Sequence, residues 1–487
     1  MTSREQLAWA VVAAPAVIAV LVVLTPRRVV TTLAVVGAFV TAGLALALAV
    51  LAFGSLSDPV VGRWVVVDAA GGLLVAVVAV VGLASVVLSP AYLAGVDSSL
   101  GSTDRRKHTY FAVLFAFWAI LLAVPLAGNL GAAWLLIEAT TAASALLVGF
   151  SGKARALEAG WKYLILTSLG LGVALLGIVV LAAGIPGGGI GALSWRALTT
   201  YSSGSQSALV AYVLLLAGLA AKIGWAPVHN WLPDAHSEAP PPVSALLSAA
   251  LLPAVLLVAW RSEQSLDQVI GTRSAQDVLI FFGLVSLAVA IPFLWRSLPW
   301  KRLLAYSSLE HMGVIALGIG FGTPLALAGV AVHIAAHAVA KAVGFYAAAP
   351  LVDHEPRATE RAVTGIARTH PVLGGVMGIS LGALAGLPPS PLFFSEVLIV
   401  AGGFQAGRSW AAAATALLLA LGFLGLAHAL LETTVGKARR RDATRPRRLR
   451  TLALLAGASL VLLLGLSTVA LWLPGSELVD ALLKGIS

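Results

Sequence analysis

Six titratable side chains stand inside apolar stretches of this sequence, where such groups are rare unless they have a function. They are Glu138, Lys222, His333, His337, Lys341 and Glu396. An ammonium group at the centre of a bilayer costs about 2.5–3.5 kcal/mol, so each lysine needs a partner or a hydrated cavity. The two histidines and Lys341 follow one another at intervals of four residues, which puts them on one helix face. Neutral imidazole both donates and accepts hydrogen bonds, so this row suits proton transfer.

Other chemistry is open to the same side chains. Glu138 and Lys222 could form a static ion pair that fixes helix packing, although apolar packing would do this without the desolvation cost. The two histidines could be a satisfied interior pair. Haem ligation needs imidazoles from facing helices, and no second intramembrane histidine pair is evident. Zinc is disfavoured because only two nitrogen ligands are close and no carboxylate lies on that face. We therefore expect neither a metal nor a cofactor in this chain.

These residues belong to a chain whose composition excludes most soluble classes. Of the 487 residues, 59% are hydrophobic and 11% are charged, whereas soluble domains carry about 25% charged residues. The chain contains no cysteine, which excludes disulfides and thiolate sites for zinc or iron–sulfur clusters. A net charge of +10 would suggest nucleic acid as the partner of a soluble protein, but there is no soluble basic domain to bind it. The composition indicates an integral membrane protein.

The elements that must position the six side chains are transmembrane helices. A helix needs about 20 apolar residues to cross a bilayer, and the sequence has about fourteen such runs, continuous rather than alternating. We therefore expect an all-α polytopic membrane protein. The N-terminal run is predicted to be a helix rather than a signal peptide, because it is long and has no convincing cleavage site. The predicted spans lie near 7–25, 29–53, 64–88, 109–127, 129–150, 160–184, 208–226, 242–260, 278–295, 302–321, 325–350, 371–402, 411–431 and 451–473.

Two of these spans are interrupted by glycine and proline beside a charge. The seventh contains KIGWAP, which starts at Lys222, and the twelfth contains GLPPSP, which is followed by Glu396. Interrupted helices in two halves of a chain are typical of an inverted-repeat transporter with its site at the breaks. The predicted divisions are three N-terminal helices in 1–108, a first five-helix half in 109–260, a second in 261–435, and a basic loop with a last helix in 436–487.

The basic residues of the loops predict an orientation. Connections that follow odd-numbered helices hold 22 lysines and arginines, whereas the opposite side, with both termini, holds 7. The positive-inside rule then puts both termini outside and the basic loop 437–450 in the cytoplasm. A docking patch for lipid headgroups is the alternative use of that loop.

One segment carries a resemblance to a known family. Residues 222–248 read KIGWAPVHNWLPDAHSEAPPPVSALLS, which resembles the signature of the antiporter-like membrane subunits shared by respiratory complex I, membrane-bound nickel–iron hydrogenases and multisubunit cation/proton antiporters. The resemblance covers about 60–430 and implies two inverted five-helix repeats with the seventh and twelfth helices broken. Further similarities follow in the same order: Asn129-Leu with Trp134 and Glu138, KRLLAYSSLEHMG at 301–313, the row of two histidines and Lys341, and the Leu-Pro-Pro run before Glu396.

The resemblance implies roles for the six side chains. Glu138 and Lys222 correspond to a coupled pair, in which moving the carboxylate away favours release of the lysine's proton. The row of histidines and lysine corresponds to a central relay, and Glu396 to the end of the second half-channel. Several complex I relatives carry histidine where this chain has Ser248, so the link to the central row is expected to use water and hydroxyl groups. Seven further residues are candidate relay or gate groups: Ser248, Asp68, His229, Glu310, His311, His428 and Glu432.

The resemblance also implies a function and partners. The motifs are most similar to membrane subunits of group 4 nickel–iron hydrogenases and their relatives, so we expect proton translocation driven by redox chemistry in partner subunits. The expected partners are other membrane subunits and, through them, soluble hydrogenase-like or dehydrogenase subunits, in the inner cell membrane of a bacterium or archaeon. Three alternatives stay open: a Na⁺/H⁺ antiporter subunit without redox coupling, a NADH–quinone dehydrogenase antiporter-like subunit, and a non-transporting scaffold. Sodium prefers oxygen ligands, whereas the central row is histidine and lysine.

Overall fold

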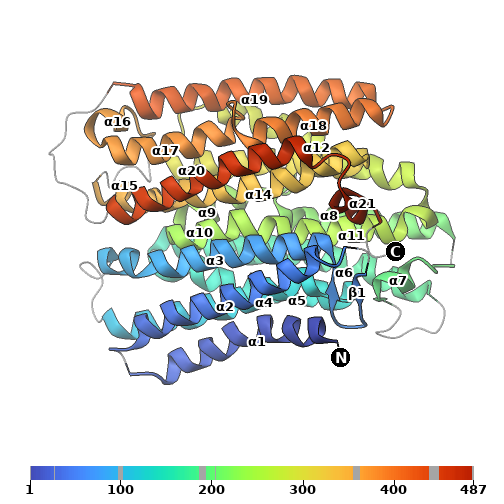
Figure 1. The fold of residues 1–487 in the computed structure, drawn as a ribbon, viewed down its shortest axis with the longest axis horizontal. Helices are drawn as coiled ribbons and strands as arrows, with labels where there is room; N and C mark the ends of the chain where they lie inside the picture. The colour runs from blue at the N-terminus through green and yellow to red at the C-terminus, as the bar shows by residue number, and fades with distance from the viewer. Residues whose placement is uncertain are drawn as a thin grey trace.

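The protein is a bundle of long helices that run side by side along one axis (Figure 1). The computed structural model describes residues 2–26, 28–56, 58–96, 103–185, 193–202, 204–354, 362–437 and 449–484. In these ranges, 13 helices are long and apolar enough to cross a membrane, and two shorter apolar helices follow one another along the chain. The predicted all-α polytopic membrane fold is confirmed, and the two short helices together make the broken twelfth span.

The first part of the chain builds the spans that hold Glu138 and Lys222. The two short strands of this part pair antiparallel and form a small hairpin. Its elements are α1 (Ser3–Leu24), α2 (Val30–Phe53), β1 (Val60–Val61), β2 (Val66–Val67), α3 (Ala69–Val96), α4 (Thr103–Ala123), η1 (Val124–Leu126), α5 (Leu130–Val148), η2 (Gly149–Ser151), α6 (Ala154–Ala183), α7 (Trp195–Leu198), α8 (Ser205–Ile223), α9 (Leu232–Glu238), α10 (Pro241–Leu246), η4 (Leu247–Leu251) and α11 (Leu252–Ile270).

The second part builds the spans that hold the central histidines and Glu396. Its elements are α12 (Thr272–Leu294), α13 (Trp300–Phe321), α14 (Pro324–Tyr346), α15 (Ala348–His354), α16 (Ile366–Thr369), α17 (Pro371–Leu384), α18 (Pro391–Gln405), α19 (Ser409–Val435), α20 (Leu449–Trp472) and α21 (Glu477–Lys484).

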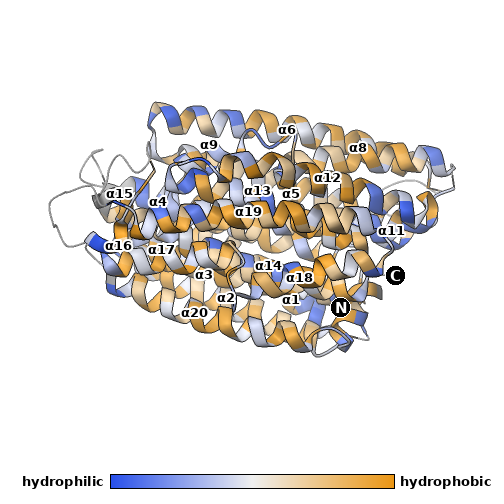
Figure 2. Ribbon diagram, turned by 90° about the horizontal axis from the view of Figure 1, so that it is seen from above, coloured by the Kyte–Doolittle hydropathy of each residue, from blue (hydrophilic) through white to orange (hydrophobic). Residues whose placement is uncertain are grey.

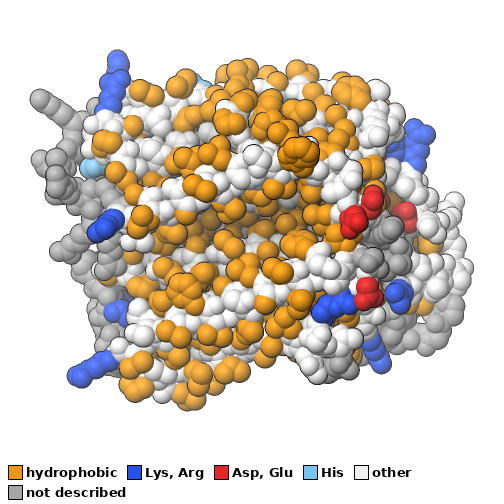
Figure 3. All heavy atoms as spheres, viewed as in Figure 1, with side chains coloured by type: hydrophobic (Ala, Val, Ile, Leu, Met, Phe, Trp, Pro, Cys, Tyr) orange, Lys and Arg blue, Asp and Glu red, His pale blue; other side chains and the backbone are white. Residues whose placement is uncertain are grey.

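An apolar belt surrounds the bundle between two polar ends. Hydrophobic residues fill the middle of the helices, and hydrophilic residues gather toward their ends (Figure 2). On the face shown in Figure 3, lysine and arginine lie at both ends, whereas aspartate and glutamate lie at one end only. Both chain termini lie at the end that holds the aspartate and glutamate side chains (Figure 1). The helices therefore cross the belt an even number of times, as the sequence predicts.

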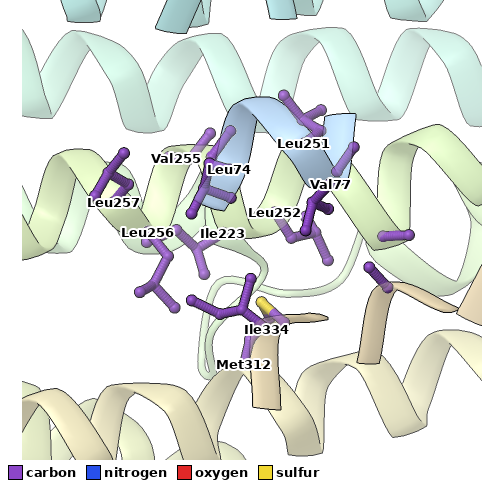
Figure 4. Close-up of a cluster of buried hydrophobic side chains, with 14 of the residues drawn as sticks. Leu74, Val77, Ile223, Leu251, Leu252, Val255, Leu256, Leu257, Met312 and Ile334 are labelled. Atoms are coloured by element: carbon purple, nitrogen blue, oxygen red, sulfur yellow. The ribbon is translucent and has the colours of Figure 1, made fainter. Parts of the chain in front are cut away.

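Apolar packing fixes the helices that carry the titratable side chains. Buried side chains from α3, α8, α11, α13 and α14 meet in one cluster (Figure 4). Ile223, Met312 and Ile334 are part of it and are at most 1% exposed. Each of these follows a titratable residue directly in the chain, so the cluster holds the backbone next to that residue. In a membrane, this van der Waals packing is a main force between helices.

The two predicted breaks are present, and each begins at a left-handed glycine. The α8 helix ends at Gly224, with φ 82°, and the loop to α9 follows. The α17 helix is followed by Gly386, with φ 69°, before α18 begins. Only glycine adopts this conformation without a steric cost, so it ends each half-helix where the chain must turn. The first break thus begins two residues after Lys222, and the second lies before Glu396 in the chain.

The eighth span is longer than predicted. We expected it to end at residue 260 and counted Arg261 as a loop residue, which is wrong: the span continues to Ile270. Arg261 is 1% exposed and donates to Asp68 Oδ1 at 2.7 Å and to the Pro125 carbonyl at 2.8 Å. The charge that ended the apolar run is thus neutralised by Asp68, which directly precedes α3, and the helix continues through it. Asp68 is the buried partner of Arg261 in this pair, and its role as a relay or gate group stays a prediction.

Replacing Asp68 by alanine is expected to lower the free energy of unfolding by about 3–5 kcal/mol, because Arg261 would stay buried without its carboxylate. Thermal unfolding of the purified protein in detergent measures the change. Asp58→Ala is the matched control, since it removes an 82% exposed partner of Arg4, and such surface pairs contribute at most about 1 kcal/mol. Equal losses in the two variants would contradict the buried clamp.

Candidate functional site

Lys222 lies in the last turn of α8 and is fully buried. Its Nζ donates to Thr141 Oγ1 of α5 at 2.7 Å and to Tyr163 OH of α6 at 2.5 Å. The Tyr163 hydroxyl also lies 2.7 Å from Ser144 Oγ. Hydroxyl oxygens can accept from an ammonium and donate to a neutral amine. This pocket therefore suits a lysine that changes its protonation state.

Glu138 stands on the same helix as Thr141, one turn earlier, but it does not bind Lys222. Its Oε1 accepts a hydrogen bond from Ser168 Oγ of α6 at 2.6 Å, and its Oε2 is buried without a partner. In the described ranges the ammonium of Lys222 contacts hydroxyl groups rather than this carboxylate. The static ion pair is thus not formed in this structure, which shows the two groups apart.

His236 lies between this pocket and the central helix, and we did not single it out from the sequence. It is fully buried on α9, and neither ring nitrogen has a hydrogen bond. Its ring centroid is 6.4 Å from Trp231, which contacts Tyr163, and 5.3 Å from Phe345 of α14. The only sign of it in the sequence is its place in the Pro-Asp-Ala-His run of residues 222–248, the segment that carries the family resemblance. Imidazole can both donate and accept a proton, so His236 joins the candidate residues.

A second link between the two halves consists of hydroxyl groups. Ser248 lies in the π-helical turn η4, and its Oγ is 2.8 Å from Ser308 Oγ of α13. The neighbouring Ser307 Oγ accepts from Lys341 Nζ, which also donates to the Leu304 carbonyl at 2.5 Å. Single π-helical turns inside α-helices occur frequently at functional sites. Ser248 therefore supplies a hydroxyl contact between the eighth span and α13, and its connection to Lys222 stays a prediction.

The central helix α14 carries His333, His337 and Lys341, all fully buried. His311 of α13 joins this row: its Nδ1 is 3.0 Å from His333 Nε2, and its ring centroid is 5.1 Å from that of His337. His333 Nδ1 lies 2.9 Å from Ser395 Oγ of α18. The two histidines of α14 are 6.4 Å apart between centroids, so the shortest connection runs through His311.

Two carboxylates lie at the far end of the row. A Cβ on Gly386 would lie 3.0 Å from Glu396 Oε2, so the carboxylate packs against the bare backbone of the twelfth-span break. Glu396 is partly exposed. Glu310 is 3% exposed, and its Oε2 has no hydrogen-bond partner. The break therefore gives Glu396 room beside the buried row.

The carboxylate near the histidines corrects one argument from the sequence. Zinc was disfavoured because no carboxylate lies on the face of α14 that carries the histidines. The structure brings one from another helix: ligand atoms of His311, His333 and Glu396 lie within 4.8 Å of one another. Spacing along a single helix could not reveal a ligand supplied by α18.

Three of the remaining candidate residues lie apart from the row. His229 lies in the loop between α8 and α9 and is 9% exposed. His428 is exposed on α19. Glu432 accepts hydrogen bonds from Ser297 Oγ at 2.9 and 3.2 Å. No hydrogen bond found among the described residues connects these three side chains with the histidine row of α14.

Lys301 is a third buried lysine that the loop count missed. We placed it in a cytoplasmic connection, but it lies in the first turn of α13 and is 8% exposed. Its Nζ donates to the carbonyls of Ser237 at 2.8 Å and Ala239 at 2.5 Å. These carbonyls flank the end of α9, so Lys301 holds the helix that carries His236. Lys301 leaves the count of basic loop residues on one side of the membrane, and Arg261 leaves the count on the other side. The excess of basic loop residues on the first side is therefore unchanged.

A family profile matches the region that contains the candidate site from Glu138 to Glu396. The profile, described as NADH:quinone oxidoreductase/Mrp antiporter, TM, covers residues 127–422. These residues make up more than half of the chain and include all six side chains singled out first. The chain belongs to this family.

Relatives of this antiporter family cover most of the chain. It is 32% identical over 387 residues to a hydrogenase-4 component F homolog of Methylacidiphilum infernorum, a match that covers 78% of this chain and 80% of the relative. Its fold is similar to a chain of the membrane-bound sulfane sulfur reductase, an archaeal respiratory membrane complex, with a TM-score of 0.83, 20% identity and coverage of 98% and 100%. A chain of the Mrp complex from Dietzia sp. gives a TM-score of 0.83 at 21% identity, with coverage of 99% and 97%. The expected family resemblance is confirmed.

Proposed function

We propose that this chain carries protons across the membrane as the antiporter-like subunit of a larger, redox-driven complex related to membrane-bound hydrogenases. The observation that carries the proposal is a buried line of titratable and hydroxyl side chains that lie between the two broken spans. Its parts are the Lys222 pocket, the Ser248–Ser308 pair at 2.8 Å and the His311–His333 pair at 3.0 Å. Such groups are costly inside a membrane and typically mark a proton pathway.

We infer an order for the proton route from these contacts. Protons enter beside Glu138 and reach Lys222, then cross through His236 and the serine hydroxyls to Lys341 and His337. From there the ring of His311 leads to His333, and the proton leaves beside Glu396. Movement of Glu138 toward or away from Lys222 supplies the control, because a nearby carboxylate stabilises the charged lysine.

The proposal extends to partners and location. The relative named as a hydrogenase-4 component supports a redox-driven assembly, and both structural neighbours are chains of multisubunit complexes. Other membrane subunits are the direct partners, and soluble hydrogenase-like or dehydrogenase subunits act through them. The membrane is the inner cell membrane, with both termini outside and the basic loop 437–450 in the cytoplasm. Residues 438–448 of that loop lie outside the described part of the chain.

A Na⁺/H⁺ antiporter subunit without redox coupling is the second candidate. The fold likeness to the Mrp complex supports it. Sodium requires carboxylate and carbonyl oxygens, whereas the centre of this line consists of imidazoles and amines. The chemistry of the line therefore favours protons as the transported ion.

Purification of the complex from its own membrane, through a tag on this chain, distinguishes the two candidates. Mass spectrometry and metal analysis identify the bound subunits, and reconstitution into liposomes with a fluorescent pH indicator measures proton movement. We expect iron-containing partners and acidification that starts on addition of NADH or dihydrogen. Proton movement that requires a sodium gradient, in a preparation without metal clusters, would overturn the redox-driven proposal.

His236→Phe is expected to slow proton transport by about tenfold, because it removes both exchangeable nitrogens while the hydroxyl link remains. The reconstituted complex provides the measurement. His428→Phe is the matched control on the exposed face of α19, and full transport is expected. An unchanged rate in His236→Phe would remove this histidine from the route and leave only the serine link.

A further inference from the structure

Three helices each contribute one metal-ligating side chain to the end of the buried line. His311 comes from α13, His333 from α14 and Glu396 from α18, and one ligand atom of each lies within 4.8 Å of the other two. His311 Nδ1 and His333 Nε2 are 3.0 Å apart. Ligand atoms around tetrahedral zinc, with Zn–N bonds of about 2.0–2.1 Å, are about 3.3 Å apart. The two imidazoles thus need to separate by only a few tenths of an ångström, and the flexible Glu396 side chain can close the site.

The surroundings of His333 fix which nitrogen is available. Ser395 Oγ donates its hydrogen to the Leu392 carbonyl at 2.7 Å. At 2.9 Å from His333 Nδ1, the same oxygen can therefore only accept. With the hydroxyl hydrogen on the Leu392 carbonyl, the matching tautomer of His333 carries its proton on Nδ1 and leaves the Nε2 lone pair toward His311. Metal-bound histidines have this arrangement, in which the second nitrogen donates to an outer group.

His311 has a matching outer group at the broken span. Its buried Nε2 has no hydrogen-bond partner of ordinary geometry among the described residues. The backbone of Leu384, the last residue of α17, lies next to this ring. Coordination through Nδ1 would put the ring proton on Nε2, where the Leu384 carbonyl can accept it. Each imidazole therefore has a hydrogen-bond acceptor for the ring nitrogen that faces away from the metal.

We propose that His311, His333 and Glu396 bind a zinc ion, and that bound zinc blocks proton transfer along the line. Two imidazoles and one glutamate, with a fourth position left for water, are a donor set that zinc uses in proteins. The partly exposed Glu396 gives the ion an entry from the side at which protons leave. Zinc occupies the lone pairs that must accept protons, so transfer stops while it is bound. The block of proton transfer by zinc rests on the proposed proton route, whereas the binding of zinc to the three side chains does not.

Zinc binding to the purified complex tests the site directly. After treatment with a chelator, the complex is equilibrated with zinc chloride, and bound metal is counted by mass spectrometry. We expect His333→Ala and Glu396→Gln each to bind one zinc ion fewer per complex than the wild type. In the wild type, X-ray absorption at the zinc edge should show that the ion which these variants lack has nitrogen and oxygen ligands at about 2.0–2.2 Å. His428→Ala, outside the cluster, should retain the full zinc content.

Ser395→Ala supplies a variant that leaves all three ligands in place. It removes the acceptor of His333 Nδ1, and loss of such an outer partner typically weakens metal affinity by about 10–100-fold. Equal zinc content and affinity in the wild type, His333→Ala and Ser395→Ala would overturn the site. The wild-type complex should also lose proton transport when zinc is added and regain it with chelator. Zinc that binds without changing transport would overturn the block.

The two proposals fail in different ways. A complex that moves no protons, but loses one zinc ion in His333→Ala, would overturn the proposed function and support the metal site. A complex that moves protons at the same rate with and without zinc, and binds the same amount of metal in every variant, would overturn the metal site and support the transport function.

Discussion

Lys222→Met is expected to lower proton transport by at least ~100-fold, the effect typical of removing a positioned proton-transfer group. The methionine side chain fills a similar volume but neither carries nor releases a proton. The hydroxyls of Thr141 and Tyr163, which now hold the ammonium at 2.7 and 2.5 Å, would lose their donor. The rate of acidification by the reconstituted complex measures the loss, and native gel electrophoresis checks that the complex is intact.

Two further lysine substitutions show whether charge or proton exchange is required. Lys162→Met is the matched control: Lys162 is 47% exposed on α6 and pairs with Glu158, so transport should be unchanged. Lys222→Arg keeps the positive charge, but a guanidinium group does not release its proton in proteins. We expect this variant to be as inactive as Lys222→Met. Full transport by Lys222→Arg would show that the lysine acts only as a fixed charge and would contradict the proposed route.

His311→Phe is expected to have an effect of similar size, at least ~100-fold. His311 contacts His333 at 3.0 Å and stands 5.1 Å from His337 between ring centroids. Phenylalanine keeps the ring in the packed core and removes both nitrogens, so the connection between the two histidines of α14 is interrupted. Acidification by the reconstituted complex again gives the rate.

The comparison with His428→Phe controls for the loss of a histidine as such, since His428 is exposed on α19. Electron transfer by the same complex, measured with an uncoupler present, shows whether the redox partners still function. Normal proton transport in His311→Phe would mean that protons pass from His337 to His333 without this ring, through water. Loss of both transport and electron transfer would indicate a defect of assembly instead.

The membrane fold could be predicted from the sequence because it depends on long windows of one property. About 20 apolar residues suffice to define a span, and glycine or proline beside Lys222 and before Glu396 marked the breaks. The row on α14 could also be predicted, since four-residue spacing determines a helix face. These features are local, and no knowledge of neighbouring helices is needed to derive them.

The features that sequence reasoning missed depend on contacts between distant segments. Arg261 ended the apolar run, but Asp68, far away in the chain, neutralises it at 2.7 Å and lets the helix continue. Lys301 is bound by carbonyls at the end of α9. His236 has no periodic partner on its short helix, and its position beside α14 follows only from packing. The carboxylate of the histidine cluster comes from a helix beyond a break. Hydropathy and spacing carry no information on such pairs.

The π-helical turn η4 acts as a one-residue insertion in the eighth span. An α-helix rotates by about 100° per residue, so the extra residue turns the two ends of this span relative to each other. Ser248, within this turn, reaches Ser308, and Arg261, after the turn, reaches Asp68. Deleting one residue from this turn would leave only one of these contacts in register. A relative with an uninterrupted α-helix here would be one residue shorter. It would need a different side chain either for the contact with Ser308 of α13 or for the ion pair with Asp68, directly before α3.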